Sequence, residues 1–281
     1  IPLPVIVGSD IAGVVSALGD GVTSWRVGDR VLLDPVLRKA GRYGMIGEIC
    51  DGGRAELIAV PADQLVRVPD AVTLDQAAAL PLAYGTAHRM MYTRGHVSAG
   101  ERVLVLGASG GVGVACVQLA KLAGAEVIAC ASTDEKLTRL RDVGADHVLN
   151  YVTRPFAESV REIFGKPRIS GGGGVDVVVN FTGGDTWEPS QRCLRVGGRI
   201  LTCGATAGYA VQTDMRYLWT YEQEMIGSNG WSVDDLYRLL TLIEAGRLDP
   251  VIDRRFGLED TAEAERLLED REVLGKVLIT P

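Results

Sequence analysis

Short apolar runs, separated by glycine, proline and aspartate, recur through the first eighty residues. The clearest of them are Val5–Val7, Ala12–Val15, Arg30–Leu33 and Ala55–Val60. These runs are rich in β-branched side chains, and the first hundred residues show no helical period, which is typical of a β-rich fold. We therefore predict a β-rich domain over residues 1–83.

After Leu80 the pattern changes to an alternation of short buried strands and helices. The predicted strands are Arg102–Leu106, Glu126–Ala131, His147–Asn150, Val175–Asn180, Arg199–Thr202 and Glu224–Ser228. The predicted helices are Val112–Leu122, Asp134–Val143, Pro155–Phe164 and Glu188–Leu194. Such an alternation is typical of βαβ units on a parallel sheet whose two faces are both covered. It predicts a second, α/β domain over residues 84–229.

A third pattern begins after Gly230. Leu236, Leu239, Leu240 and Ile243 have the spacing of one helix face, and this helix is expected to end at Gly246. A further helix is expected over Thr261–Glu269 and a strand over Val277–Thr280. Because residues 230–281 lack a βαβ partner, we expect them to return to the first domain.

Composition narrows the class of protein. The 281 residues predict about two domains, and the 47% hydrophobic and 23% charged content is that of a globular protein. A net charge of −7 argues against binding to nucleic acid, and no apolar run approaches the ~18 residues that span a bilayer. The five scattered cysteines predict reduced thiols in a cytoplasmic protein. The opening Ile-Pro-Leu-Pro, without Met, leads us to expect a preceding segment.

A glycine-rich turn follows the first strand of the α/β series. It reads Gly107-Ala108-Ser109-Gly110-Gly111-Val112-Gly113 and matches the spacing of G-x-G-x-x-G, with Ala108 in the first position. In this motif Gly110 lets the backbone approach a pyrophosphate, and Gly113 lets the helix pack against the strand. The helix N-terminus adds N–H groups and a partial positive charge. We therefore predict that residues 108–113 bind a dinucleotide; the alternative is a tight structural turn.

The end of the second strand indicates which dinucleotide is bound. NAD sites usually carry an Asp or Glu there, about 20 residues after the glycine turn, to accept from the ribose hydroxyls. This chain instead has Ser132 and Thr133, which can donate to a 2′-phosphate, and Lys136 follows one helical turn later. NADP(H) is therefore favoured over NAD(H), although Lys136 is also compatible with a solvated helix lysine.

Several motifs in the same order resemble the medium-chain dehydrogenase/reductase superfamily, which holds zinc alcohol dehydrogenases and quinone reductases. They include Pro4-x-x-x-Gly8-Ser9-Asp10-x-Ala12-Gly13-Val14-Val15, Trp25-x-Val27-Gly28-Asp29-Arg30-Val31, Asp51-Gly52-Gly53-x-Ala55-Glu56, Pro81-x-x-x-x-Thr86-Ala87, Gly144-Ala145-Asp146 and Gly197-Gly198-Arg199. The resemblance implies a GroES-like β-rich catalytic domain plus a Rossmann doubly wound parallel-sheet cofactor domain. It also implies NAD(P)-dependent hydride transfer in a cleft between them.

The resemblance also implies where zinc ligands would stand. The family's catalytic His position holds Ser9, and a later Cys position falls at Pro81-Leu82-Ala83-Tyr84, so neither offers a zinc donor. The dispersed His88, His96 and His147 form no ligand spacing. The segment Leu33–Gly47 lacks the four cysteines of the family's structural-zinc lobe, and Cys50 alone makes no site. We therefore expect no zinc.

The resemblance places further cofactor-binding residues along the carboxyl edge of the parallel sheet. These are Thr86 beneath the nicotinamide, Phe181, Thr182 and Gly183 after the fourth strand, Gly204 and Ala205 after the fifth, Asn229 and Gly230 after the sixth, and Lys276 near the pyrophosphate. The candidate proton donors are Tyr84, Ser9 and Asp10. For Tyr84 a packed aromatic, for Asp10 a buried structural acceptor and for Lys276 a surface lysine are the alternatives.

Together these observations predict a zinc-independent reductase. An alcohol then has no metal to polarise it, and the resemblance to the family's zinc-free branch implies that hydride from NADPH reaches a quinone or an activated alkene or carbonyl, such as an enone, enal or enoyl thioester. The alternatives are a zinc-type NAD(P)-dependent alcohol dehydrogenase whose ligands lie in missing segments, and a non-catalytic NADP-binding protein. A homodimer or homotetramer, formed through the edge strand near Ile226, is expected from the resemblance.

Overall fold

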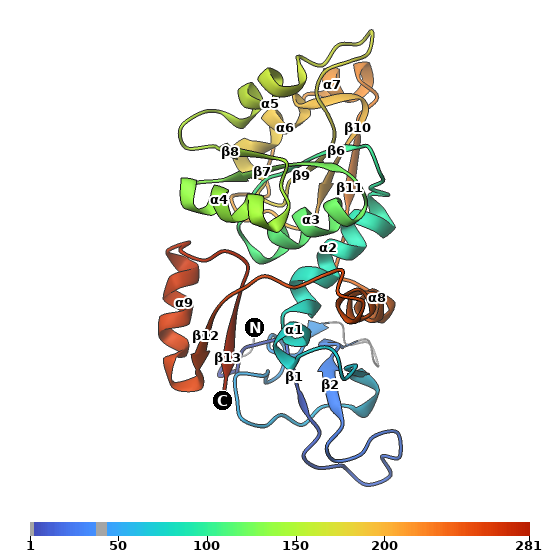
Figure 1. The fold of residues 1–281 in the computed structure, drawn as a ribbon, viewed down its shortest axis with the longest axis vertical. Coiled ribbons are helices and arrows are strands. Elements are labelled where there is room, and N and C mark those ends of the chain that lie inside the picture. Colours follow the sequence, from blue (N-terminus) through green and yellow to red (C-terminus); the bar gives the residue numbers. More distant parts are fainter. Residues whose placement is uncertain (1–2, 38–43) are drawn as a thin grey trace. The chain divides into compact units, whose positions relative to one another are not determined.

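The computed structural model describes residues 3–37 and 44–281, which divide into two compact units (Figure 1). Unit 1 consists of residues 1–85 and 231–281, and unit 2 of residues 86–230. The sequence pattern placed the boundaries after residues 83 and 229. Part of the segment examined for a structural-zinc lobe, residues 38–43, lies outside the described residues. In the described part of the chain, no helix combines the length and apolar character needed to cross a bilayer.

Unit 2 is built on a six-stranded sheet in the order β11-β10-β9-β6-β7-β8. Every neighbouring pair is parallel, and the strand order reverses at β6, as in a doubly wound dinucleotide-binding domain. The strands are β6 (Arg102–Val105), β7 (Glu126–Ala131), β8 (His147–Asn150), β9 (Val175–Val179), β10 (Leu194–Thr202) and β11 (Glu224–Gly227). This confirms the predicted Rossmann-type sheet.

Helices cover both faces of this sheet (Figure 1). They are α2 (Thr86–His88), α3 (Gly111–Leu122), α4 (Asp134–Val143), α5 (Phe156–Phe164), α6 (Trp187–Gln191) and α7 (Met215–Thr220), with a π-helical segment at Arg89–Arg94. One predicted helix and one predicted strand need correction. The helix predicted to reach Leu194 ends at Gln191, because β10 begins at Leu194 and not at Arg199. The short helices α2 and α7 and the π-helical segment Arg89–Arg94 were not predicted.

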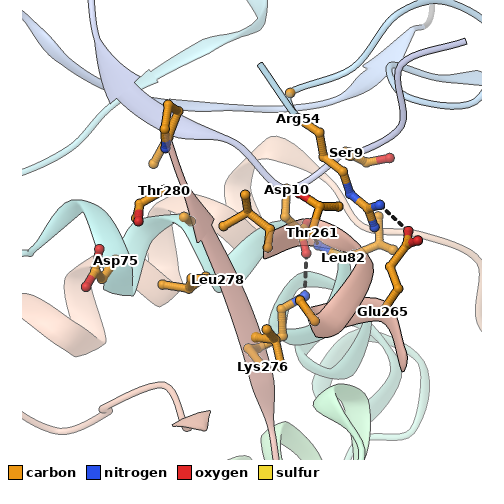
Figure 2. Close-up of a pocket in the computed structure, with 18 of the residues that line it drawn as sticks. Ser9, Asp10, Arg54, Asp75, Leu82, Thr261, Glu265, Lys276, Leu278 and Thr280 are labelled. Carbon is orange, nitrogen blue, oxygen red and sulfur yellow. Dashed lines mark hydrogen bonds and ion pairs between the residues drawn. The ribbon is translucent and has the colours of Figure 1, made fainter. Parts of the chain in front are cut away.

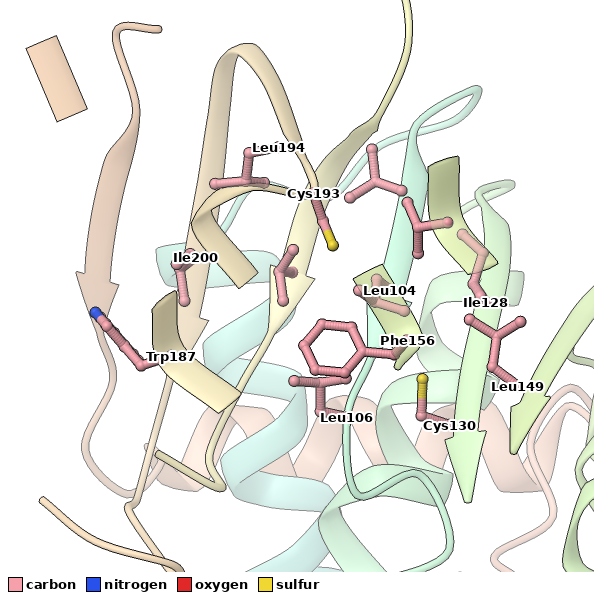
Figure 3. Packing of buried hydrophobic residues seen from close by; sticks show 13 residues of the cluster. Leu104, Leu106, Ile128, Cys130, Leu149, Phe156, Trp187, Cys193, Leu194 and Ile200 are labelled. Atoms are coloured by element: carbon pink, nitrogen blue, oxygen red, sulfur yellow. The ribbon is translucent and has the colours of Figure 1, made fainter. Parts of the chain in front are cut away.

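Buried apolar side chains fill the space between the sheet and the helices α5 and α6, which cover one of its faces (Figure 3). Leu104, Ile128 and Ile200 come from the strands, while Phe156 and Trp187 come from the helices. The central strands β6, β7 and β9 are mostly buried, and their sequences are largely apolar because helices cover both faces of the sheet. The burial of these strands explains why their apolar runs could be recognised in the sequence.

Unit 1 contains a three-stranded antiparallel sheet and two strand pairs. The sheet has the order β1 (Ala12–Val14), β2 (Arg30–Leu33) and β5 (Leu65–Arg67); the pairs are β3 (Val36–Leu37) with β4 (Gly44–Met45) and β12 (Ile252–Gly257) with β13 (Lys276–Thr280). Two predicted strands are absent from the described structure: Val5–Val7 and Ala55–Val60 are irregular. The carbonyls of Ile6 and Val7 instead accept hydrogen bonds from the turn at residues 52–54.

The helices of unit 1 correct a second expectation. The first hundred residues contain α1 (Leu74–Ala78) and a π-helical segment, Leu80–Gly85, although they lack a helical period. A capping box between Thr73 and Gln76 starts α1. The sequence therefore marks this helix by its N-terminal cap and not by a helical period of apolar residues. The later helices are α8 (Val233–Glu244) and α9 (Thr261–Glu269), and α8 packs against Leu80–Gly85.

Candidate functional site

The glycine-rich turn joins β6 to α3 through a close backbone contact. Gly107 adopts a φ of +64°, which turns the chain sharply out of the strand. A Cβ atom on Gly113 would lie 2.2 Å from the Gly107 carbonyl oxygen and 2.7 Å from the Ala108 Cα. Only glycine therefore allows the first turn of α3 to pack on the end of β6.

Gly110 occupies the second glycine position of the motif, and its surroundings differ from those of Gly113. It is exposed, has a φ of −77°, and an added Cβ atom would come no closer than 3.7 Å to its nearest neighbour, the Gly107 carbonyl oxygen. The protein's own packing therefore does not require glycine here. Gly110 is the N-cap of a twelve-residue helix whose first N–H groups have no carbonyl partner within the helix. This cradle fits the pyrophosphate of a dinucleotide.

A buried asparagine fixes the chain where it leaves β9. The Asn180 side chain is fully buried, and its Oδ1 accepts hydrogen bonds from the Thr182 and Gly183 amides at 3.0 and 2.9 Å. Its Nδ2 donates to Thr186 Oγ1 and Ser190 Oγ, both at 3.0 Å. Asn180 was not among the predicted site residues. An Asn directly after an apolar strand can accept hydrogen bonds from the next amides, and this position was the only local indication of its role.

The predicted residues after β9 lie beside the glycine turn and beside the loop after β10. A Cβ atom on Gly107 would lie 3.2 Å from the Phe181 ring, and one on Gly183 would lie 3.2 Å from Ala205 Cβ. The Thr206 amide donates to the Phe181 carbonyl at 3.2 Å. The structure thus brings the turn at 107–113, residues 181–183 and residues 204–205 together at one edge of the sheet.

The sixth strand ends at the same edge, because β10 and β11 pair in parallel with Thr202 opposite Gly227. The predicted residues Asn229 and Gly230 follow that strand. The Arg94 Nε atom donates to the Gly227 carbonyl at 3.0 Å, which ties the π-helical segment to this end of β11. The predicted Thr86 is half-buried and begins α2, which packs against α3.

The three residues proposed to select the coenzyme lie between β7 and α4. Thr133 is the N-cap of α4, and its hydroxyl oxygen accepts from the Lys136 amide at 3.3 Å. Ser132 is half-buried beside it. Lys136 is 9% exposed, so the alternative of a solvated helix lysine is wrong. The three residues remain a predicted 2′-phosphate site.

Unit 1 holds a second group of predicted residues around a cavity of about 450 Å³ (Figure 2). Asp10 Oδ2 pairs with Lys276 Nζ at 2.5 Å, and Asp10 Oδ1 accepts from the Leu82 amide at 2.7 Å. The two charged side chains are only 16% and 19% exposed. Asp10 is thus a largely buried acceptor, and Lys276 is not the surface lysine considered as its alternative. Ser9 also lines this cavity.

A second ion pair borders the same cavity and was not predicted. Arg54, from the turn after Gly53, pairs with Glu265 of α9 (Figure 2). In the sequence, Arg54 occupies the variable position of the Gly-Gly-x-Ala-Glu motif, so the motif itself carried no signal. Glu265 lies more than two hundred residues away, and only the folded chain shows that the two side chains meet.

Tyr84 is fully buried inside unit 1. Its hydroxyl oxygen accepts a hydrogen bond from the Val251 amide at 2.8 Å. This environment is that of a packed aromatic residue whose polar end has found a backbone partner. The structure therefore does not place Tyr84 on the wall of the cavity that Ser9, Asp10 and Lys276 share.

The residues at the family's catalytic-zinc positions do not fit a zinc site. They are the hydroxyl of Ser9 and the alkyl side chain of Leu82, and both line the same cavity. Among the described residues, no three His, Cys, Asp or Glu side chains are grouped closely enough to hold a metal ion. His147 hydrogen-bonds Glu126 at 3.0 Å, and His88 packs edge-on against Tyr92.

The five cysteines are free thiols. Burial raises the pKa of the Cys193 thiol to about 12 and that of Cys203 to about 11, and it also raises the pKa values of Cys116 and Cys130. These four thiols are therefore protonated near neutral pH and are poor nucleophiles and metal ligands.

Comparisons with known proteins agree with this architecture. A family model described as the alcohol dehydrogenase GroES-like domain matches residues 1–70, and one described as zinc-binding dehydrogenase matches residues 111–245. A crystal structure of an NAD-dependent alcohol dehydrogenase is similar with a TM-score of 0.90 and 37% identity, over 100% of this chain and 84% of that one.

Two relatives named for enoyl thioesters are also similar. The crotonyl-CoA reductase of Streptomyces avermitilis is 32% identical over 92% of this chain, which spans only 64% of that protein's length. The structure of a 2-octenoyl-CoA carboxylase reductase in complex with NADP and 2-octenoyl-CoA has a TM-score of 0.87 and 30% identity, over 98% of this chain and 68% of that one.

Proposed function

Because the chain belongs to the medium-chain dehydrogenase/reductase superfamily, we propose that it transfers hydride from NADPH to an activated alkene, carbonyl or quinone without catalytic zinc. The observation that supports this proposal is the open N-terminus of α3, where a Cβ atom on Gly110 would lie 3.7 Å from its nearest neighbour, so the protein's own packing does not require glycine. NADPH, when bound, supplies the hydride.

The residues of unit 2 are proposed to bind and orient the coenzyme. The N-terminus of α3 holds the pyrophosphate, and Ser132, Thr133 and Lys136 hold the 2′-phosphate. The turn that Asn180 fixes, with Phe181, Thr182 and Gly183, supports the ribose on the nicotinamide side. Support for NADP(H) comes from these side chains and from the NADP complex of the similar carboxylase reductase.

The acceptor class follows from the residues around the cavity of unit 1. Ser9 and Leu82 stand where the family's zinc enzymes carry ligands, and neither can act as one. An alkene conjugated to a carbonyl accepts hydride at its β-carbon without a Lewis acid, because the charge that develops is delocalised onto the carbonyl oxygen. The names of the two enoyl-CoA relatives support this class.

Of the three candidate proton donors, we propose that only Ser9 contacts the substrate. The Tyr84 hydroxyl oxygen is occupied by the Val251 amide inside unit 1, and Asp10 is held by Lys276 and Leu82. Ser9→Ala is expected to slow NADPH-dependent turnover, whereas Tyr84→Phe is expected to retain it. Full turnover in both variants would mean that neither the Ser9 nor the Tyr84 hydroxyl assists the reaction.

The test is NADPH oxidation by the full-length protein with quinones, enals, enoyl thioesters and saturated aldehydes, with and without a chelator. We expect chelator-insensitive turnover of the conjugated acceptors and tighter binding of NADPH than of NADH. Chelator-sensitive oxidation of alcohols would favour a zinc-type alcohol dehydrogenase, which the 37% identical structure makes the second candidate. NADPH binding without any turnover would favour a non-catalytic protein.

We also propose a cytoplasmic homodimer or homotetramer. The free, largely buried thiols support a reducing compartment. The edge strand β11 leaves Met225 and Ile226 half-buried, which suits pairing with a second copy. Light scattering of the purified protein, with Ile226→Lys as the disrupting variant, measures the assembly directly.

A further inference from the structure

The cavity of unit 1 is bordered by two ion pairs of different character (Figure 2). Asp10 and Lys276 are largely buried, and Asp10 has a second partner in the Leu82 amide. Arg54 is 28% exposed, and its partner Glu265 is 49% exposed and projects from α9. An anion entering the cavity therefore competes for Arg54 more easily than for Lys276, because a half-exposed carboxylate is displaced at little cost.

The backbone around Arg54 is held firmly against the loop that carries Ser9. The amides of Gly52, Gly53 and Arg54 donate to the carbonyls of Ile6, Gly8 and Val7 at 2.7, 2.8 and 3.1 Å. A Cβ atom on Gly53 would lie 2.3 Å from Ile11 Cγ1, so the turn packs closely against the Ile11 side chain. The base of the Arg54 side chain is thus fixed beside Ser9, and only its guanidinium end is free to change partner.

A guanidinium presents paired N–H groups that match the two oxygens of a carboxylate or phosphate. A cavity of about 450 Å³ lies in the range of small-molecule sites. Its wall combines this cation with the alkyl side chains of Leu82, Leu268 and Leu278. The arrangement suits a ligand with an apolar chain and one anionic group.

We propose that Arg54 binds the anionic group of the substrate in exchange for Glu265, so that the enzyme selects α,β-unsaturated acyl compounds that carry negative charge. This inference rests on the proposed reductase function, and it makes Arg54 a specificity residue. The anion is either a free carboxylate or the phosphates of a coenzyme A thioester, which share the chemistry that a guanidinium recognises.

The test compares three probes with the same four-carbon chain: crotonaldehyde, which is neutral, crotonate and crotonyl-CoA. Arg54→Gln is expected to weaken binding of at least one anionic probe by about tenfold or more, and to leave the KM for crotonaldehyde within about twofold. Whether crotonate or crotonyl-CoA responds identifies the source of the anion. Glu265→Gln is expected to tighten binding of the same anion, because it removes the competing carboxylate.

The opposite signs of the two variants separate binding from structure. If the Arg54–Glu265 pair only stabilised the fold, both substitutions would act in the same direction and equally on neutral and anionic probes, and that result would overturn the proposal. Arg67→Gln is the matched control, because Arg67 pairs with Asp29 in the same unit and does not line the cavity. It should change none of the three probes.

Binding of crotonate and crotonyl-CoA is measured by calorimetry as well as by turnover, so the two proposals can fail separately. If no acceptor is reduced but Arg54→Gln still abolishes binding of an anion, the reductase function fails and the role of Arg54 stands. If the unaltered protein reduces crotonaldehyde but binds neither anion, the role of Arg54 is wrong and the reductase function stands.

Discussion

The two units build their candidate sites from different parts of the chain. In unit 2 the part of the site outside the predicted 2′-phosphate pocket is mainly backbone: the turn at residues 107–113, the N-terminus of α3 and the loops that follow β9 and β10. In unit 1 the site consists of charged side chains: Asp10 and Arg54, from the first part of the chain, pair with Lys276 and Glu265, from its last part. A backbone site is sensitive to one added methyl group, whereas a charged site is sensitive to the loss of one partner.

The difference explains why the two sites were unequally visible in the sequence. Glycine is required where the backbone passes through a tight space, and the requirement stays within a dozen neighbouring residues. An ion pair between residues 54 and 265 leaves no local pattern, since either residue alone is compatible with a solvated surface. Substitutions in the two units should therefore differ in size and in kind.

The largest effect is expected at Gly113. Gly113→Ala would place a methyl group 2.2 Å from the Gly107 carbonyl oxygen, a backbone atom that cannot move without shifting the turn. We expect the free energy of unfolding to fall by about 3 kcal/mol and NADPH binding to be lost. Urea denaturation and a fluorescence titration with NADPH measure the two effects.

Gly110→Ala is the matched control for that substitution. Its methyl group would lie 3.7 Å from the nearest atom, which is ordinary contact. We expect the free energy of unfolding to change by less than about 1 kcal/mol and the Kd for NADPH to rise about tenfold or more. Equal NADPH affinity in this variant and the unaltered protein would mean that no phosphate group approaches Gly110.

An intermediate effect is expected for the buried ion pair of unit 1. Lys276→Met leaves the Asp10 carboxylate 16% exposed and without its cation, which should lower the free energy of unfolding by about 2 kcal/mol. Arg154→Gln removes a partner from a pair whose side chains are 42% and 62% exposed, and it should be indistinguishable from the unaltered protein. Equal stability of both variants would contradict the assigned role of the Asp10–Lys276 pair.

The smallest effect concerns Asp146 on the surface of unit 2. Burial raises the pKa of this carboxyl, but hydrogen bonds from Lys121 and the Val127 amide outweigh it and hold the pKa below its ordinary value of 3.8. A lowered pKa in the folded state adds stability above pH 3.8, and this stability is lost as the pH falls through the folded value.

With the side chain 37% exposed, the contribution should be about a few tenths of a kcal/mol. Urea denaturation of the unaltered protein and of Asp146→Asn should show this gap at pH 7 and a smaller one at pH 3. A difference in the free energy of unfolding that grows as the pH falls would contradict a lowered pKa of Asp146.

The sequence by itself determined the sheet of unit 2 and the position of its glycine turn. Glu126–Ala131 and His147–Asn150 match the observed strands, because each contains a short apolar run and its ends are set by local turns. Asp134–Val143 and Thr261–Glu269 match observed helices for a similar reason, since an amphipathic period belongs to the segment itself.

Only the tertiary structure decided which β-rich segments of unit 1 become strands and which charges meet. Ala55–Val60 has strand composition but is irregular, because a strand exists only where a partner accepts its hydrogen bonds. The partner of Lys276, the burial of Lys136 and the contact of Tyr84 with Val251 are likewise properties of distant segments brought together. Backbone requirements depend on neighbouring residues and can be recognised in the sequence. Contacts between distant segments depend on the fold of the whole chain.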